Sequence, residues 1–429
     1  MPNKLLLLIL ILFLTACGSQ SAQPALTNLP LDPTRTVTVV VPTAKPEPTF
    51  TRRQPRVNLT TSGIIRFDET WRGEIHLTGD ITFANGATLT IEPGTQVYIT
   101  PNQDDQGTGD ECIDQYIRDY NDPVGSAEWD QNAILIDGRN GVIQAIGTAQ
   151  QPIVFRPEGE GTSPAQWYGI FIEKGSLQHS MILYGGRTAV QVVPTAQGVE
   201  IAYNEVRFAH WSNISDFGQN SWVHHNIVEG GGHQAVSSGF NAVVEHNIIS
   251  HSQTCLAVDE KATVRNNLFI DCDRGVRLGF GDDIRFINNT IAWVNGPPDG
   301  WYYQGKLVYP AFEFTEGIEL MRTLPGTQIL NNIIYGPYQA AINLMEVAGE
   351  GSVIDYNLMW GQTELFAGQW QSAPIGEQNI NQDPLFVDPA GGDFHLQSGS
   401  PAIDAGYPQV LDADGSPADL GVYGGPVGT

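Results

Sequence analysis

Asparagine recurs in this chain at a nearly constant spacing, and this repeat limits the possible folds more than any other feature. Each repeat begins with Asn and two mostly apolar residues, and successive steps are 22, 21, 20, 22, 43 and 25 residues. A period of this length, filled with short β-branched runs and Gly or Asn turns, predicts the stacked coils of a solenoid. The members of the column are Asn204, Asn226, Asn247, Asn267, Asn289, Asn332 and Asn357.

The composition agrees with a chain made of strands and turns. Among 429 residues there are 47 Gly, and only 16% are charged, which excludes a coiled coil and a long acidic disordered chain. Gly and β-branched residues disfavour helix and favour turns and strands. The formal net charge of -26 argues against nucleic acid as a partner, because the phosphate backbone would be repelled.

Within the repeats, short strands alternate apolar and polar side chains, as in Val276-Arg277-Leu278 and Ile342-Asn343-Leu344. Together with the Asn column, this pattern resembles the right-handed parallel β-helix, the pectin-lyase-like architecture. The resemblance implies an all-β solenoid of about 12 coils over residues 57–405, with a capping segment at residues 406–429. We expect the Asn column to be a structural ladder of stacked amides rather than a catalytic feature.

The first residues predict export and a lipid anchor. Lys4 precedes an apolar run over residues 5–14, which is too short to span a bilayer and is typical of a signal peptide. The string Leu14-Thr15-Ala16-Cys17 resembles the bacterial lipobox, which implies removal of residues 1–16 and lipid attachment at Cys17. An ordinary secretory signal with a chance Cys is the alternative. The expected location is the bacterial cell envelope, anchored to the membrane by lipid and facing outward or the periplasm.

Residues 17–56 are rich in Pro and Thr and lack a sustained apolar period. Such a segment cannot bury enough apolar surface to offset its ordering entropy, so we interpret it as a tether.

Two insertions interrupt the repeat. The first, residues 101–131, carries nine acidic residues against one basic residue, Arg118. This density of oxygen ligands suits calcium, although a solvated acidic loop is the simpler interpretation because no fixed calcium-loop spacing is present. A turn containing Asp412 and Asp414, with Asp419 nearby, is a similar candidate for calcium or for capping.

The second insertion, residues 295–316, is rich in aromatic side chains and includes Trp301, Tyr302 and Tyr303. Aromatic faces stack on the apolar faces of sugar rings, so these residues are candidates for substrate binding. The alternative is that the rings only hold the loop in place.

Register relative to the Asn column predicts a polar file beside this insertion. Arg277, Glu319 and Asn343 should point outward from successive coils, about 4.8 Å apart, with Arg274 on the first of these coils. A polar file flanked by aromatic rings suits a polysaccharide groove, which makes all four residues candidates for substrate binding. Surface ion pairing would explain the same residues.

Three functions remain open. We favour a monomer that binds extracellular polysaccharide and whose sequence shows no complete catalytic set. The second is a polysaccharide lyase or glycoside hydrolase acting on uronate-containing glycans, and the third is an adhesive or structural solenoid with a protein partner. Lyases on this fold use Lys or Arg as a base, and residues 255–277 faintly resemble their Lys and Arg coils, so the catalytic candidates are Lys261, Arg277 and Glu319. β-Elimination is favoured over hydrolysis because the motif set of the hydrolases is incomplete.

His179, His225 and His246 share the position immediately before the Asn column, where Tyr203 and Asn266 also occur. A position that accepts His, Tyr and Asn is more typical of a turn that needs a polar residue than of a metal site.

Cys255 and Cys272 lie in neighbouring coils but are offset by three residues relative to their Asn. Three residues of strand span about 10 Å, so we expect buried thiols rather than a disulfide.

Overall fold

The computed structural model describes residues 55–101, 103–106, 133–159, 166–296, 300–303, 306–310, 316–322, 325–346, 349–369, 375–426 and 428. Contacts divide the chain into two units, Met1–Thr51 and Arg52–Thr429, and every strand below belongs to the second. The predicted signal peptide, Cys17, Cys112 and the tether as far as residue 54 therefore lie outside the described residues. None of the described residues forms a helix long and apolar enough to cross a membrane.

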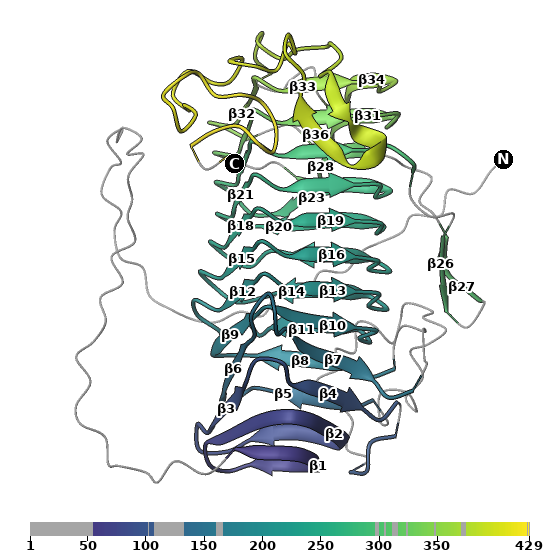
Figure 1. The fold of residues 1–429 in the computed structure, drawn as a ribbon. Helices are drawn as coiled ribbons and strands as arrows, with labels where there is room; N and C mark the ends of the chain where they lie inside the picture. The colour runs from purple at the N-terminus through teal and green to yellow at the C-terminus, as the bar shows by residue number, and fades with distance from the viewer. Residues whose placement is uncertain are drawn as a thin grey trace, which may run out of the picture. The chain divides into compact units, whose positions relative to one another are not determined.

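The second unit is a right-handed parallel β-helix, as the repeat predicts (Figure 1). One sheet joins 32 of the strands, and from β3 onwards each strand pairs in parallel with the next strand on its own face, usually three places along the chain. Each coil therefore contributes one strand to each of three faces. The chain enters through β1 (Arg56–Ile65) and the long strand β2 (Glu69–Phe83), which pairs with strands of all three faces.

Face 1 consists of β5 (Leu135–Asp137), β8 (Gly169–Ile172), β11 (Thr188–Val192), β14 (Ser212–Asp216), β17 (Gln234–Ser237), β20 (Thr254–Asp259), β23 (Arg274–Phe280), β28 (Glu316–Leu320), β31 (Ala340–Leu344) and β34 (Glu364–Gly368). Face 2 consists of β3 (Thr88–Ile91), β6 (Val142–Ile146), β9 (Gly175–Gln178), β12 (Glu200–Ala202), β15 (Trp222–His224), β18 (Val243–Glu245), β21 (Thr263–Arg265), β24 (Arg285–Ile287), β29 (Gln328–Leu330) and β32 (Val353–Asp355). Face 3 consists of β4 (Gln96–Ile99), β7 (Ile153–Pro157), β10 (Ser180–Leu183), β13 (Glu205–Arg207), β16 (Ile227–Glu229), β19 (Ile248–Ser250), β22 (Leu268–Ile270), β25 (Thr290–Ala292), β30 (Ile333–Tyr335) and β33 (Leu358–Trp360).

Two antiparallel pairs stand outside this sheet: β26 (Gly300–Tyr303) with β27 (Lys306–Pro310), and β35 (Phe386–Asp388) with β36 (Asp393–Leu396). A single 3₁₀ turn, η2 (Pro389–Gly391), separates β35 from β36.

The core runs the length of the helix because every strand turns alternate side chains inward. On the short strands of faces 2 and 3 the central residue is the buried one, as with Val223 in β15 and Val228 in β16, both 0% exposed. Burying one such side chain stabilises the fold by about 1.5–3 kcal/mol. Stacking identical positions therefore gives a continuous apolar column from short strands that would be unstable alone.

The Asn ladder lies at the corner between faces 2 and 3, and each amide links two coils. Asn226 donates from Nδ2 to the Ile201 carbonyl and to Asn247 Oδ1, both at 2.9 Å, and its backbone N–H also donates to Asn247 Oδ1 at 2.9 Å. The ladder continues one coil beyond the expected members, because Asn357 donates to Asn379 Oδ1 at 3.1 Å. The predicted structural role of this column is confirmed.

The residue before each ladder Asn from Asn204 to Asn357 is in the left-handed conformation, and so is His179 at the equivalent position before Ser180. Their φ values lie between 47° and 58° at His179, Tyr203, His225, His246, Asn266, Asn288, Asn331 and Tyr356. Asn and His tolerate this conformation better than most residues, which explains the mixed composition of the column. The predicted turn role of these residues is confirmed.

The C-terminal segment folds back over the outer side of face 3. Phe386, Phe394 and Leu420 pack on Leu268 and Ile333 and form a second apolar core. Polar contacts with the column before the ladder hold the segment in place: Asn266 donates to the carbonyls of residues 422 and 424, and Asn288 to that of residue 419.

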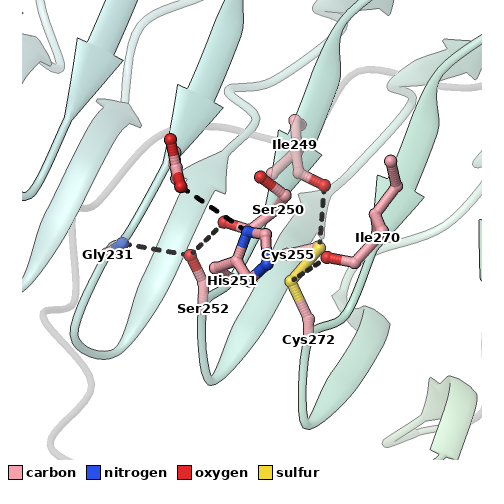
Figure 2. The surroundings of a disulfide bond; sticks show 9 residues. Gly231, Ile249, Ser250, His251, Ser252, Cys255, Ile270 and Cys272 are labelled. Atoms are coloured by element: carbon pink, nitrogen blue, oxygen red, sulfur yellow. Dashed lines mark hydrogen bonds and ion pairs between the residues drawn. A yellow bond between two sulfur atoms is a disulfide. The ribbon is translucent and has the colours of Figure 1, made fainter. Parts of the chain in front are cut away.

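Cys255 and Cys272 form a disulfide, so the expectation of buried thiols is wrong (Figure 2). Their Cα atoms are 5.7 Å apart, well within disulfide reach. The straight-strand estimate fails because Cys272 lies in the turn before β23, where the chain bends back over the coil that holds Cys255. Both side chains are fully buried, so the bridge joins adjacent coils inside the core.

Candidate functional site

Face 1 carries a file of polar side chains in the register that the sequence predicts. Arg277 of β23 pairs with Glu319 of β28, and Glu319 pairs with Asn343 of β31. Earlier coils place Ser215 and Ser237 in the same column. The predicted file is therefore confirmed, and with Ala257 between Ser237 and Arg277 the column forms a narrow floor over several coils.

Arg274, Arg277, Glu316 and Glu319 form one ion cluster at the centre of this floor. Arg274 Nε lies 3.2 Å from Glu319 Oε2 and 3.9 Å from Glu316 Oε2, and Arg277 Nε lies 3.8 Å from Glu319 Oε2. The two carboxylate side chains are only 7–8% exposed, whereas that of Arg277 is 23% exposed. Arg277 is thus the more accessible of the two guanidinium groups.

Glu316 is the carboxylate of the cluster whose surroundings shift its pKa. Burial raises the pKa of Glu316, and the opposing effects of Arg274 and of the Asn343 hydrogen bond are smaller. Asn343 Nδ2 donates to Glu316 Oε1 at 3.2 Å, while the buried Oε2 has no hydrogen-bond partner.

Trp211 and His233 lie next to the cluster, and sequence reasoning did not select them. Their rings stack with centroids 4.4 Å apart. Burial, together with the charges of Arg277 and Arg274, lowers the pKa of His233 to about 4, so its imidazole is neutral at neutral pH. Trp211 directly precedes Ser212 and His233 directly precedes Gln234, and Ser212 pairs with Gln234 on the adjacent coil. This shared register is the signal by which the sequence could have indicated the two stacked rings.

Lys261 belongs to a different part of the coil. It lies in the turn between faces 1 and 2 with φ of 60°, its Nζ is 3.1 Å from Glu260 Oε1, and it sits over the Phe240 ring at 5.0 Å. The structure brings Arg277 and Glu319 together but places Lys261 in this separate set of contacts.

The aromatic residues Trp301, Tyr302 and Tyr303 form β26, which pairs with β27 as a hairpin. The structure describes the backbone of these residues but not their side chains. The hairpin is inserted between β25 and β28, so it leaves face 3 and leads into Glu316, the first residue of β28.

The carboxylates near the C-terminus accept hydrogen bonds from backbone amides. Asp412 accepts from the N–H groups of Asp419 and Gly425, Asp414 from that of Ser416, and Asp419 from that of Asp404. These contacts fit the capping alternative. Within the described ranges, no group of three or more His, Cys, Asp or Glu side chains is placed to hold a metal ion.

Most of the acidic insertion, residues 107–131, lies outside the described residues. At its start, Asp104 Oδ1 accepts from the backbone of Asp80, and Asp105 Oδ2 accepts from Ser62 and Thr78 hydroxyls. These two acids therefore connect the insertion to the first coils.

Residues 188–349 match the family model described as "Right handed beta helix region". No curated protein matches the sequence. Among solved structures, the Dettilon tailspike protein is 10% identical with a TM-score of 0.35, covering 76% of this chain and 62% of that one. A complex of alginate lyase AlyF-OU02 with G6 is 13% identical with a TM-score of 0.40, covering 82% and 86%. Pectate lyase Pel9A is 10% identical with a TM-score of 0.37, covering 77% and 88%.

The chain spans about three fifths of the length of that tailspike. At these identities the likeness concerns the fold alone.

Proposed function

We propose that this chain binds an acidic extracellular polysaccharide along face 1. The observation that carries the proposal is the ion cluster of Arg274, Arg277, Glu316 and Glu319 in the outward column of this face. A guanidinium group pairs with a carboxylate through two parallel hydrogen bonds, so the partly exposed Arg277 suits a uronate group.

The shape of the floor supports a linear ligand. Outward positions of successive coils are about 4.8 Å apart, so a polymer lying along the helix axis meets one new side chain per coil. Ser215 and Ser237 keep the floor low at one end of the file, and Asn343 continues it beyond the charged cluster.

The aromatic hairpin is proposed as the wall of this site. Its insertion point at Glu316 adjoins the charged cluster, and aromatic faces contribute to sugar binding by stacking. Replacing Trp301 by Ala should weaken glycan binding by about 1–3 kcal/mol while leaving the melting temperature nearly unchanged.

Binding of the full-length chain to arrays of uronate-containing and neutral glycans tests the proposal. Arg277→Ala should weaken binding to uronate-containing chains about tenfold or more and affect neutral chains less. Arg285→Ala is the matched control, because Arg285 is exposed on face 2. Equal losses for both ligand classes, or for both variants, would contradict a uronate site.

The same experiment also tests the lyase alternative. New unsaturated chain ends that disappear in Arg277→Ala would replace binding by β-elimination as the function. Binding of a protein partner with no glycan binding would favour the adhesive alternative instead.

We further propose that Cys17 carries a lipid and that residues 17–56 tether the β-helix at the bacterial envelope. The apolar run and the lipobox-like string support this proposal.

A further inference from the structure

We propose that His224 and His225 form a two-nitrogen site for a divalent transition metal, Cu(II) or Ni(II), at the corner between faces 2 and 3. The site is independent of the glycan floor on face 1. It differs from the column of His179, His225 and His246, because His224 belongs to β15.

The distance between the two nitrogens fits one metal ion. His224 Nδ1 and His225 Nδ1 are 2.9 Å apart and hydrogen-bonded, so a metal ion would displace the proton between them, which would be released to solvent. With metal–nitrogen bonds of about 2.0–2.1 Å, two nitrogens at this separation subtend an angle of about 90° at the metal. That angle belongs to neighbouring positions of a square-planar or octahedral ion, whereas a tetrahedral ion needs nitrogens about 3.3 Å apart. The geometry therefore favours Cu(II) or Ni(II) over Zn(II).

A carboxylate prepares His224 to act as a ligand. Glu200 Oε1 lies 3.1 Å from His224 Nε2, on the opposite side of the ring from Nδ1. A proton held at Nε2 by this carboxylate leaves the Nδ1 lone pair available, and carboxylates commonly orient metal-binding histidines in this way. Trp222 stacks on the ring at 3.8 Å, and the His224 side chain is only 3% exposed, so its orientation is restrained.

His225 is held by its neighbours and remains open to solvent. Its ring stacks between Tyr203 at 4.7 Å and His246 at 4.8 Å, and its side chain is exposed. Since no group of three or more such ligands occurs among the described residues, water would complete the coordination.

Calorimetric titration of the metal-free full-length chain with CuCl₂, NiCl₂ and ZnCl₂ tests the site. His225→Asn and His224→Gln each remove one ligand, and Asn is compatible with the left-handed position because Asn266 occupies it two coils away. His246→Asn is the control, since it makes the same change one coil away and removes no proposed ligand. We expect one Cu(II) per chain, binding at least tenfold weaker in both ligand variants and within about twofold of wild type in the control.

Electron paramagnetic resonance of the Cu(II) complex gives an independent result. Coupling of Cu(II) to two imidazole nitrogens supports the site. If thermal melts show that a ligand variant is unfolded, this spectrum of the wild-type chain takes the place of the titration as the test. Absence of a one-to-one Cu(II) site, coupling to fewer than two nitrogens, or an equal loss in His246→Asn would overturn the proposal. Tighter binding of Zn(II) than of Ni(II) would overturn the assigned geometry.

Discussion

His233 shows how its surroundings, rather than residue type, set the charge of a side chain on face 1. Its imidazole is partly buried against Trp211 and faces the positive charges of Arg274 and Arg277, and these effects keep it neutral. Burial likewise raises the pKa of Glu316.

The lowered pKa of His233 predicts a loss of stability in acid. The unfolded chain binds a proton near pH 6.5 and the folded chain only near pH 4, so this residue's contribution is complete above pH 6.5 and declines as the pH falls through that interval. His233→Gln should reduce the loss of unfolding free energy between pH 7 and pH 4 by about 2–3 kcal/mol. Urea denaturation at both pH values measures this difference.

The exposed His395, with a side chain 59% exposed, supplies the control variant His395→Gln. An equal change in both variants would show that the local surroundings of His233 do not matter.

The individual coil is held by its corners as much as by its strands. At the ladder, one amide side chain satisfies backbone groups on two neighbouring coils, and the preceding residue takes the left-handed conformation that turns the chain. The disulfide between Cys255 and Cys272 adds a covalent link at the corner between faces 3 and 1.

Removing one ladder amide should therefore destabilise two coils. Asn247 donates to the Val223 carbonyl and to Asn267 Oδ1, and its own Oδ1 accepts from the Asn226 backbone. Asn247→Ala leaves these buried groups unpaired, so we expect the free energy of unfolding to fall by about 3–5 kcal/mol in chemical denaturation. The exposed amide of Gln219 is the control, and a comparable loss in Gln219→Ala would argue against the ladder as the cause.

Across the whole β-helix unit, distant segments complete the surface of face 3. The C-terminal segment covers the outer side of β22, β25, β30 and β33, where Leu268 and Ile333 would otherwise be exposed. Asn266 and Asn288 at the neighbouring corner hold its backbone, whereas coils beyond its reach carry Tyr203, His225 and His246 at the same position.

Weakening this segment should expose face 3 without unfolding the coils. Phe394 is 1% exposed in the second apolar core, and Phe394→Ala should cost about 3–5 kcal/mol of local stability. We expect faster proteolysis within residues 383–426 and increased binding of a hydrophobic dye. The control is Val387→Ala in the exposed part of β35, and protease resistance equal to wild type in Phe394→Ala would contradict the prediction.

The lipid anchor is tested on the full chain in a bacterial host. Cys17→Ser should abolish fatty-acid labelling and release or misprocess the protein, because the thiol is the site of attachment. Labelling that persists in Cys17→Ser would rule out this anchor. Cys112→Ser serves as the control and should leave labelling unchanged.

The repeating features of this chain can be predicted from its residues alone. A period of about 22 residues, the Asn column and the alternation within strands are local patterns, and parallel stacking then placed Arg277, Glu319 and Asn343 in one file. Features that depend on bends and on contacts between distant segments could not be predicted in this way and are known only from the folded chain. Corner geometry joined Cys255 to Cys272 and placed Lys261 in a turn, and neither follows from counting residues along straight strands. Packing alone decided that the C-terminal segment lies on face 3, because burying apolar surface depends on shape and not on distance along the chain.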